Sequence, residues 1–414
     1  MMLRIKDYTT KVGSGVTPRG GAETYLDEGI PLFRSQNVTN DGFLMDDIAF
    51  ISEEVDESMK GTRVKPGDVL LNITGASIGR CFYTSDDFER GNVNQHVCII
   101  RPKKNKVKPD YLHYCIISDK GQQQIDLTQT GANREGLAVE DIKGFMFDIP
   151  SLPVQQRIVD YLNKTLTKID ERIEVLEKQK DAYVRLKKSI IHQAVTRGLK
   201  PNVSLKDSGI EWIGMIPEHW EVKRIKDLCS FVSRGSTPDY VDESDFPVMN
   251  QAVFSSGRIN HEVVRYSSYM KPESKIEKGD LLIASTGGGI LGKLYFFNIE
   301  DEQFYADTHV TIVRSPKKTF CVKFLYYLLS IGYNMINSCM AKGSTNQTEL
   351  QRDKLIAYEI AIPSIEEQTR IIDYLDEKCT KIDAAIENIG KQIDASKRLV
   401  RALINEVITG QRAV

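Results

Sequence analysis

The chain has 414 residues, of which 41% are hydrophobic and 27% charged, and its formal net charge is −2. This is the composition of a globular protein, and roughly 150 residues per domain predicts two or three domains. No run approaches the ~18 apolar residues of a membrane helix, and the start MMLRIKDYTT has no apolar signal core. We therefore expect a cytoplasmic protein that is neither secreted nor bound to a membrane.

The seven cysteines stand singly, with no CxxC pair and no metal-ligand spacing. We expect them to be reduced thiols, and we expect no metal site. The near-neutral net charge gives no global argument for nucleic-acid binding, so any such function has to be argued from other features.

Residues 1–151 contain short β-branched or aromatic runs, such as VLLNITG, VCIIRP and FMFDIP, bounded by Gly, Pro, Asn and Asp. This texture predicts a strand-rich mixed domain, with one helix near Pro109–Ser118. Residues 152–197 change character, because apolar residues there recur at alternating steps of three and four. That spacing predicts a long helix with a heptad seam. The seam includes Leu162, Leu166, Ile169, Ile173 and Leu176.

Residues 198–363 predict a linker and a second strand-rich domain, with the runs LLIAST, VTIVRS and YEIAIP and a helix near Cys321–Ser330. Residues 364–414 predict a second long helix with its own heptad seam. This seam includes Leu375, Ile382, Ile386, Ile389 and Ile393.

The second half of the chain repeats the first. Residues 150–162, PSLPVQQRIVDYL, match residues 363–375, PSIEEQTRIIDYL, at a shift of 213 residues. The same shift places His96 on His309 and Arg101 on Arg314, and with small gaps Thr74-Gly75 falls on Thr286-Gly287 and Gln36 on Gln251. The chain is therefore two copies of one unit of roughly 200 residues.

Each long helix has one apolar stripe, which must be buried against another surface. We expect the two stripes to pair as an antiparallel coiled coil, because a stripe of about five heptads is longer than one small domain would cover. The alternative is that each helix packs back on its own strand-rich domain. The predicted fold class is α+β, with an internal pseudo-twofold repeat.

Several motifs, in the same order in both halves, carry a family resemblance. They are Ile149-Pro150-Ser151 with Gln155, the matching Ile362-Pro363-Ser364 with Gln368, and the Gly-Asp and Thr-Gly pairs. The linker DSGIEWIGMIPEHWEVKRIKDL at residues 207–228, with Trp212 and Trp220, occurs only before the second copy. Together they resemble the specificity (S) subunit of type I restriction-modification systems.

The resemblance implies a non-catalytic subunit that binds double-stranded DNA and reads a two-part target, one half per strand-rich domain. It implies that the helices act as a spacer and as the docking site for two methyltransferase (M) subunits, and that endonuclease (R) subunits join the complex. S-adenosylmethionine is then expected on the M subunits, and ATP and Mg on the R subunits, with no cofactor in this chain. The alternative function is a coiled-coil scaffold without DNA readout.

Two matched Gly-rich loops are candidates for contact with the DNA backbone, because each exposes small hydroxyls and ends in a cation. The alternative is a plain tight turn. Their candidate residues are Thr74, Ser77 and Arg80 in the first copy and Thr286 and Lys293 in the second.

Asn, Gln and Arg side chains pair bidentately with base edges, so polar loops rich in them are candidates for base reading. A solvated loop is the alternative. These candidates are Arg34, Gln36, Asn37, Asn133 and Arg134 in the first copy and Asn250, Gln251, Thr345, Asn346 and Gln347 in the second. His96 and His309 each open an apolar strand, and we expect either a structural or a DNA-facing role for them.

Overall fold

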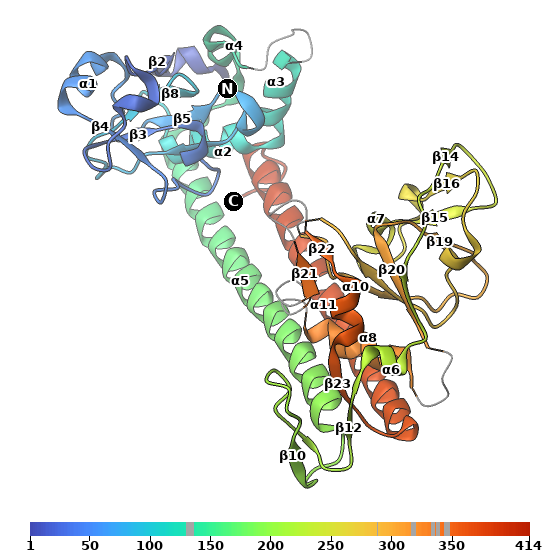
Figure 1. Cartoon of the computed structure of the whole chain (residues 1–414). Coiled ribbons are helices and arrows are strands. Elements are labelled where there is room, and N and C mark those ends of the chain that lie inside the picture. The colour runs from blue at the N-terminus through green and yellow to red at the C-terminus, as the bar shows by residue number, and fades with distance from the viewer. Residues whose placement is uncertain (130–135, 288, 316–319, 333–335, 337–339, 343–347) are drawn as a thin grey trace. The chain divides into compact units, whose positions relative to one another are not determined.

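The computed structural model describes the chain except residues 130–135, 288, 316–319, 333–335, 337–339 and 343–347 (Figure 1). The chain divides into two compact units. Unit 1 comprises Met1–Glu177 and Gly390–Val414, and unit 2 comprises Lys178–Ile389. Each unit therefore holds one strand-rich domain and a stretch of both long helices.

Unit 1 is built on an antiparallel four-stranded sheet and two smaller sheets. The four strands follow the order β2 (Thr9–Ser14), β8 (Val97–Pro102), β5 (Val69–Asn72) and β6 (Cys81–Tyr83). The other strands are β4 (Ala49–Ile51), β3 (Ile30–Phe33) and β7 (Asn92–Val93) in one sheet, and β1 (Met2–Arg4) with β9 (Met146–Asp148) in another. The short helices are α1 (Glu53–Ser58), α2 (Pro109–Ile117), α3 (Asp119–Gln129) and α4 (Val139–Gly144).

Unit 2 repeats this plan. Its main sheet has the order β13 (Phe231–Arg234), β20 (Val310–Arg314), β17 (Leu281–Ala284) and β18 (Leu294–Phe296). The second sheet is β14 (Tyr240–Val241), β16 (Arg265–Ser267), β15 (Pro247–Met249) and β19 (Tyr305–Ala306), and β12 (Glu221–Arg224) pairs with β23 (Glu359–Ile362). Two further pairs are β10 (Leu205–Asp207) with β11 (Met215–Pro217), and β21 (Ala341–Lys342) with β22 (Glu349–Leu350). The short helices are α6 (Ile225–Leu228), α7 (Gln251–Phe254), α8 (Val322–Ile331) and α10 (Arg352–Ala357).

The structure confirms the internal repeat in its strand order and in its side-chain contacts. β2-β8-β5-β6 corresponds to β13-β20-β17-β18, and the parallel pair β3–β7 corresponds to β15–β19. Arg101 donates to the buried carboxylate of Asp68, and the matched Arg314 donates in the same bidentate way to Asp280. The two halves thus keep one fold although most of their loops differ in sequence.

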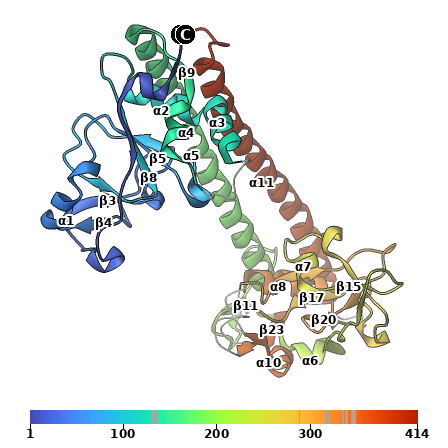
Figure 2. The same cartoon turned by 90° about the horizontal axis from the view of Figure 1, so that it is seen from above.

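Both long helices form as the heptad spacing predicts. They are α5 (Leu152–Arg197) and α11 (Ile365–Ile408), and their stretches lie side by side and antiparallel within each unit (Figures 1 and 2). A matched buried glutamine fixes the first turn of each helix to its domain. Gln155 accepts a hydrogen bond from the Lys108 N–H, and Gln368 accepts one from the Cys321 N–H, both at 2.9 Å.

The apolar seams contribute to buried clusters in both units, as expected, with Leu162 in unit 1 and Leu375 in unit 2. In unit 2, Lys187 of α5 donates to both carboxylate oxygens of Asp383 of α11. In unit 1, Leu162 packs into the core of the first domain and also joins Leu403 and Ile404 of α11 in the same cluster. The helices therefore pair with each other and pack on the strand-rich domain at the same place. The ten seam residues named above are all buried or half-buried.

The two-tryptophan linker has a structural role in unit 2. The Trp220 side chain is fully buried, contacts Phe324 edge to face, and joins a cluster with Ile191 and Val195 near the end of α5. Trp212 stacks on Tyr358. These contacts tie the linker to the second domain and to α5.

Across the described residues, none of the helices has the length and apolar character needed to cross a membrane.

Candidate nucleic-acid interface

An open surface depression of about 390 Å³ in unit 1 gathers candidates from three separate loops. Five of its lining residues are candidates from the sequence: Gln36, Thr74, Ser77, Arg80 and His96. Ser35, Gly75 and Ala76 complete the lining. The structure therefore brings together candidates that lie up to 60 positions apart in the chain, from Gln36 to His96.

Strand register explains why two of these loops meet. In the antiparallel pair β5–β8, Asn72 lies opposite Val97, so Thr74 leaves β5 beside His96, which precedes β8. In unit 2, Ala284 lies opposite Val310 in the pair β17–β20, which places Thr286 beside His309. The same register thus builds the same corner in both domains.

A threonine–histidine hydrogen bond closes this corner in each unit. Thr74 Oγ1 lies 2.6 Å from His96 Nδ1, and Thr286 Oγ1 lies 2.7 Å from His309 Nδ1. The histidine backbone is held in each case by the side chain two residues before it. The His96 N–H donates to Asn94 Oδ1 at 3.1 Å, and the His309 N–H donates to Asp307 Oδ1 at 2.9 Å.

Sequence reasoning missed Asn94 and Asp307. The signal was an Asn or Asp two residues before each matched histidine, in the runs NQH and DTH. Burial raises the pKa of the Asp307 carboxyl, and the hydrogen bond from the His309 N–H partly opposes that shift. Asp307 is thus a buried acid in unit 2 where unit 1 has a neutral amide.

The loop that carries Arg34, Gln36 and Asn37 is anchored by its own side chains. The Asn37 side chain is buried, and its amide donates to the carbonyls of Leu44 and Asp47 at 3.0 Å each. Asn37 therefore supports the loop and presents no amide to a ligand, which corrects the expectation for this residue. Arg34 donates to the Asp47 carbonyl at 2.6 Å, and the Gln36 amide donates to the Asp47 carboxylate.

In unit 2, Asn250 is likewise used by the fold, because its side chain caps α7 by accepting from the N–H groups of Ala252 and Val253. Gln251 lies close to Gly287, since a Cβ on that glycine would be 3.7 Å from Gln251 Nε2. The Gln251 Oε1 atom is buried and has no partner among the described residues. Gln251 thus takes the place beside Thr286-Gly287 that Gln36 takes beside Thr74-Gly75.

The two matched cations differ in their partners. Arg80 is exposed at the rim of the depression, with no ion pair to any described residue. Lys293 is half-buried and donates to the Ser255 carbonyl at 2.9 Å, at the end of α7. The Arg80 side chain is therefore more exposed than that of Lys293.

Five candidates fall outside the described residues: Asn133, Arg134, Thr345, Asn346 and Gln347. The described chain that follows each of these loops returns to the same corner. Thr74 forms a β-bridge with Gly136, and Thr286 forms one with Glu349. Both loops therefore rejoin the fold beside the threonine of the threonine–histidine pair.

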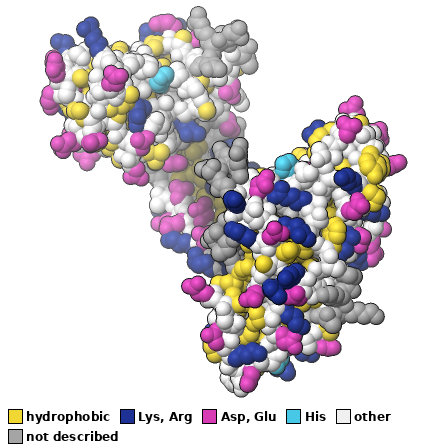
Figure 3. Space-filling model, in the orientation of Figure 1, with side chains coloured by type: hydrophobic (Ala, Val, Ile, Leu, Met, Phe, Trp, Pro, Cys, Tyr) yellow, Lys and Arg dark blue, Asp and Glu magenta, His cyan; other side chains and the backbone are white. Residues whose placement is uncertain are grey.

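The surface charge around the second domain is mixed. On the face drawn in Figure 3, Lys and Arg side chains gather over unit 2 with acidic side chains among them.

No cluster of His, Cys, Asp and Glu within the described parts of the chain has the form of a metal site. The six cysteines there are free thiols.

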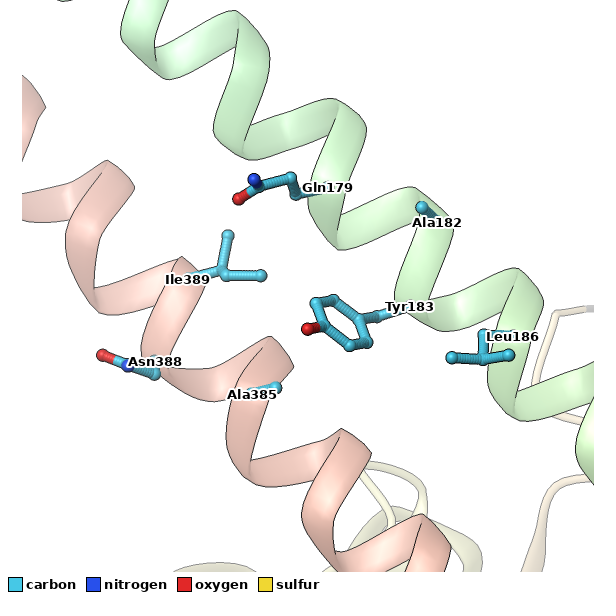
Figure 4. Close-up of a pocket in the computed structure, with 7 residues that line it drawn as sticks. All are labelled: Gln179, Ala182, Tyr183, Leu186, Ala385, Asn388 and Ile389. Atoms are coloured by element: carbon cyan, nitrogen blue, oxygen red, sulfur yellow. The ribbon is translucent and has the colours of Figure 1, made fainter.

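A second surface feature is a groove between the helix stretches of unit 2, with a volume of about 400 Å³ (Figure 4). It is lined from α5 by Gln179, Ala182, Tyr183 and Leu186, and from α11 by Ala385, Asn388 and Ile389. Tyr183 and Leu186 are 37% and 46% exposed. The groove therefore presents apolar surface next to the buried seam.

The chain matches the type I restriction modification DNA specificity domain family over residues 2–182 and 217–394, once in each half. It therefore belongs to that family. This agrees with the resemblance carried by the duplicated motifs and accounts for the internal repeat.

Two relatives that match over most of this chain are named as type I restriction enzyme specificity subunits. The chain is 23% identical to a putative type I restriction enzyme specificity subunit, MjaX, of Methanocaldococcus jannaschii, over 98% of this chain and 92% of that protein. It is 25% identical to the MjaVIII specificity subunit of the same organism, over 89% of this chain and 84% of that protein.

Solved structures share the fold. One, from work on complex assembly and conformational transition of the type I R-M system, matches with a TM-score of 0.77 at 16% identity, over 99% of this chain and 97% of that chain. The HsdS subunit of Thermoanaerobacter tengcongensis matches with a TM-score of 0.57 at 16% identity, over 100% of this chain and 97% of that chain.

Proposed function

We propose that this chain reads a bipartite DNA target, with each strand-rich domain recognising one half. The observation that carries the proposal is the duplicated corner, in which the same threonine–histidine pair sits beside a glutamine and a Gly-rich loop in both units. In unit 1 the cation Arg80 lines the same depression. A surface built twice on one fold suits a ligand with two similar parts. Membership of the DNA specificity family supports the same function.

The proposal divides the chain by function. Residues 1–151 and 198–363 recognise DNA, and residues 152–197 and 364–414 form the spacer and the docking site for two M subunits. Methylation, with S-adenosylmethionine, is assigned to the M subunits, and cleavage, with ATP and Mg, to R subunits. The complex acts in the cytoplasm. The groove of unit 2 offers an M subunit the exposed apolar side chains Tyr183 and Leu186 beside the polar Gln179 and Asn388.

The test is to map methylated adenines in a host that lacks its own adenine methylation. The host expresses the cognate M subunit with or without this chain. The expected result is a motif of two short specific parts separated by unspecified bases, present only with this chain. A continuous motif would contradict the two-domain reading. Methylation by the M subunit that is the same without this chain would favour a scaffold without DNA readout.

A further inference from the structure

The threonine–histidine pair is shared by two domains in which several neighbouring residues differ. His96 follows Gln95 and Asn94, whereas His309 follows Thr308 and Asp307. The Arg80 side chain is exposed and forms no ion pair with a described residue in unit 1, whereas the Lys293 side chain donates to a carbonyl in unit 2. The Oγ1–Nδ1 bond is nevertheless the same to within 0.1 Å, at 2.6 and 2.7 Å.

Side chains that read two different half-sites must differ between the domains, because base edges differ. A pair that stays the same suits the part of DNA that is the same in both half-sites, which is the phosphate backbone. The position of the pair agrees with this. Thr74 and His96 line the open depression of unit 1, and His309 is exposed in unit 2.

The pair differs from the links that only hold the fold together. Two other matched side-chain bonds, Asp68 with Arg101 and Gln155 with the Lys108 N–H, each use a side chain that is fully buried. Both members of each threonine–histidine pair keep solvent-exposed surface. The tie between the two loops is therefore placed where a ligand reaches it.

The donor count of the pair also suits a phosphate. A neutral imidazole has one N–H, and a threonine hydroxyl has one O–H. If Nδ1–H donates to Oγ1, the threonine O–H is left to donate outward; if the hydroxyl donates to Nδ1, the imidazole keeps Nε2–H as a donor. In unit 1, the Gln95 amide nitrogen lies 2.8 Å from His96 Nε2, which favours the first arrangement and leaves the Thr74 hydroxyl as the outward donor.

We propose that Thr74 with His96, and Thr286 with His309, are equivalent clamps that each donate a hydrogen bond to one backbone phosphate of their half-site. The clamp sets the position of the domain on the duplex and reads no base. In unit 1 the exposed Arg80 adds a charge contact beside it. This inference rests on the proposed function, and it adds which residues contact the part of DNA common to both half-sites.

The test uses the complex of the full chain with its M subunits and a duplex carrying the mapped bipartite target. Single phosphates are replaced one at a time by uncharged methylphosphonates, and affinity is measured for the unsubstituted chain and for Thr74→Val and Thr286→Val. Thr74→Val is expected to weaken binding about 10- to 100-fold, as for the loss of one hydrogen bond to a charged acceptor. At one phosphate of the first half-site, the loss caused by Thr74→Val and the loss caused by the methylphosphonate should not add.

Thr286→Val should show the same non-additivity at one phosphate of the other half-site only. Thr74→Ser, which keeps the hydroxyl, should restore binding, and this separates loss of the donor from loss of the loop fold. Because the hydroxyl is uncharged, Thr74→Val should leave the slope of log affinity against log salt unchanged, whereas Arg80→Ala should reduce it by about 1.

Additive losses at every phosphate would overturn the proposal, and so would a change in the methylated motif in Thr74→Val, since a clamp reads no base. The proposed function fails separately, in a different measurement. In that case the unsubstituted complex would show no preference for any bipartite duplex over a scrambled one.

Discussion

Arg101 donates from Nε and Nη2 to the two carboxylate oxygens of Asp68, at 2.7 and 2.8 Å, and the Asp68 side chain is fully buried. The pair joins β8 to the turn before β5. A buried charge that loses its partner keeps its desolvation cost. Removing one partner of such a pair therefore strongly destabilises the folded protein. This pair and its copy, Arg314 with Asp280, link the two central strands of the main sheet in each unit.

Arg101→Leu should therefore lower the free energy of unfolding by about 3–5 kcal/mol, since it leaves the Asp68 carboxylate unpaired. Urea unfolding followed by circular dichroism measures this change. The matched control is Lys143→Ala, which removes the exposed ion pair with Glu140 and should change stability by less than about 1 kcal/mol. Equal effects of the two variants would show that burial does not set the strength of the Arg101 contact.

The first unit should lose stability in mild acid because of His113. Burial lowers the pKa of this imidazole to about 4, in a site where the rings of Phe82 and Tyr83 pack against it. Above pH 6.5 the side chain is neutral in both folded and unfolded states. As the pH falls from about 6.5 towards 4, only the unfolded chain binds the proton, so the free energy of unfolding drops by up to about 1.4 kcal/mol per pH unit.

His113→Phe removes this titration and keeps an aromatic ring in the cluster. Calorimetric melting at pH 7.5 and pH 5 should show a smaller loss for His113→Phe than for the unsubstituted chain. His192→Asn, at an exposed position, is the control and should behave as the unsubstituted chain does. If the His113→Phe variant lost as much stability as the unsubstituted chain, His113 would not be the source of the acid sensitivity.

Leu186→Glu should weaken assembly with the M subunit without unfolding the chain. The Leu186 side chain is 46% exposed and lines the groove of unit 2, so a carboxylate there meets solvent in the free chain but would be buried by a docked partner. We expect at least about a tenfold weaker complex, because an unpaired buried charge costs several kcal/mol. Sedimentation of mixtures with the M subunit measures the complex.

The control for that experiment is Arg185→Ala, an exposed neighbour that does not line the groove. It should bind the M subunit as the unsubstituted chain does. Unchanged binding by Leu186→Glu would move the docking site away from this groove.

Exchanging residues 131–137 with residues 343–350 should change which half-sites are methylated and leave M binding intact. Both segments rejoin the fold beside the threonine of the clamp, through the bridges of Thr74 to Gly136 and of Thr286 to Glu349. Asn and Arg in the first segment and Asn and Gln in the second suit base-edge contacts. Methylome sequencing gives the motif, and an unaltered motif would count against these segments as base readers.

The sequence alone determined the repeat, the two long helices and the family. Local periodicity sufficed for the helices, which run from Leu152 to Arg197 and from Ile365 to Ile408, because a heptad stripe repeats every two turns and needs no distant contact to be seen. The matches of Gln155 to Gln368 and of His96 to His309 needed no structure, because a duplicated sequence shows its equivalent positions directly.

Only the tertiary structure decided which polar residues are exposed at the surface depression. Asn37 and Gln36 are neighbours of the same chemical kind, yet Asn37 is buried under its loop while Gln36 lines the depression. Thr74 meets His96 because the β5–β8 register brings them together across 22 residues. Exposure and strand register depend on contacts distant in sequence, and composition and spacing do not record those contacts.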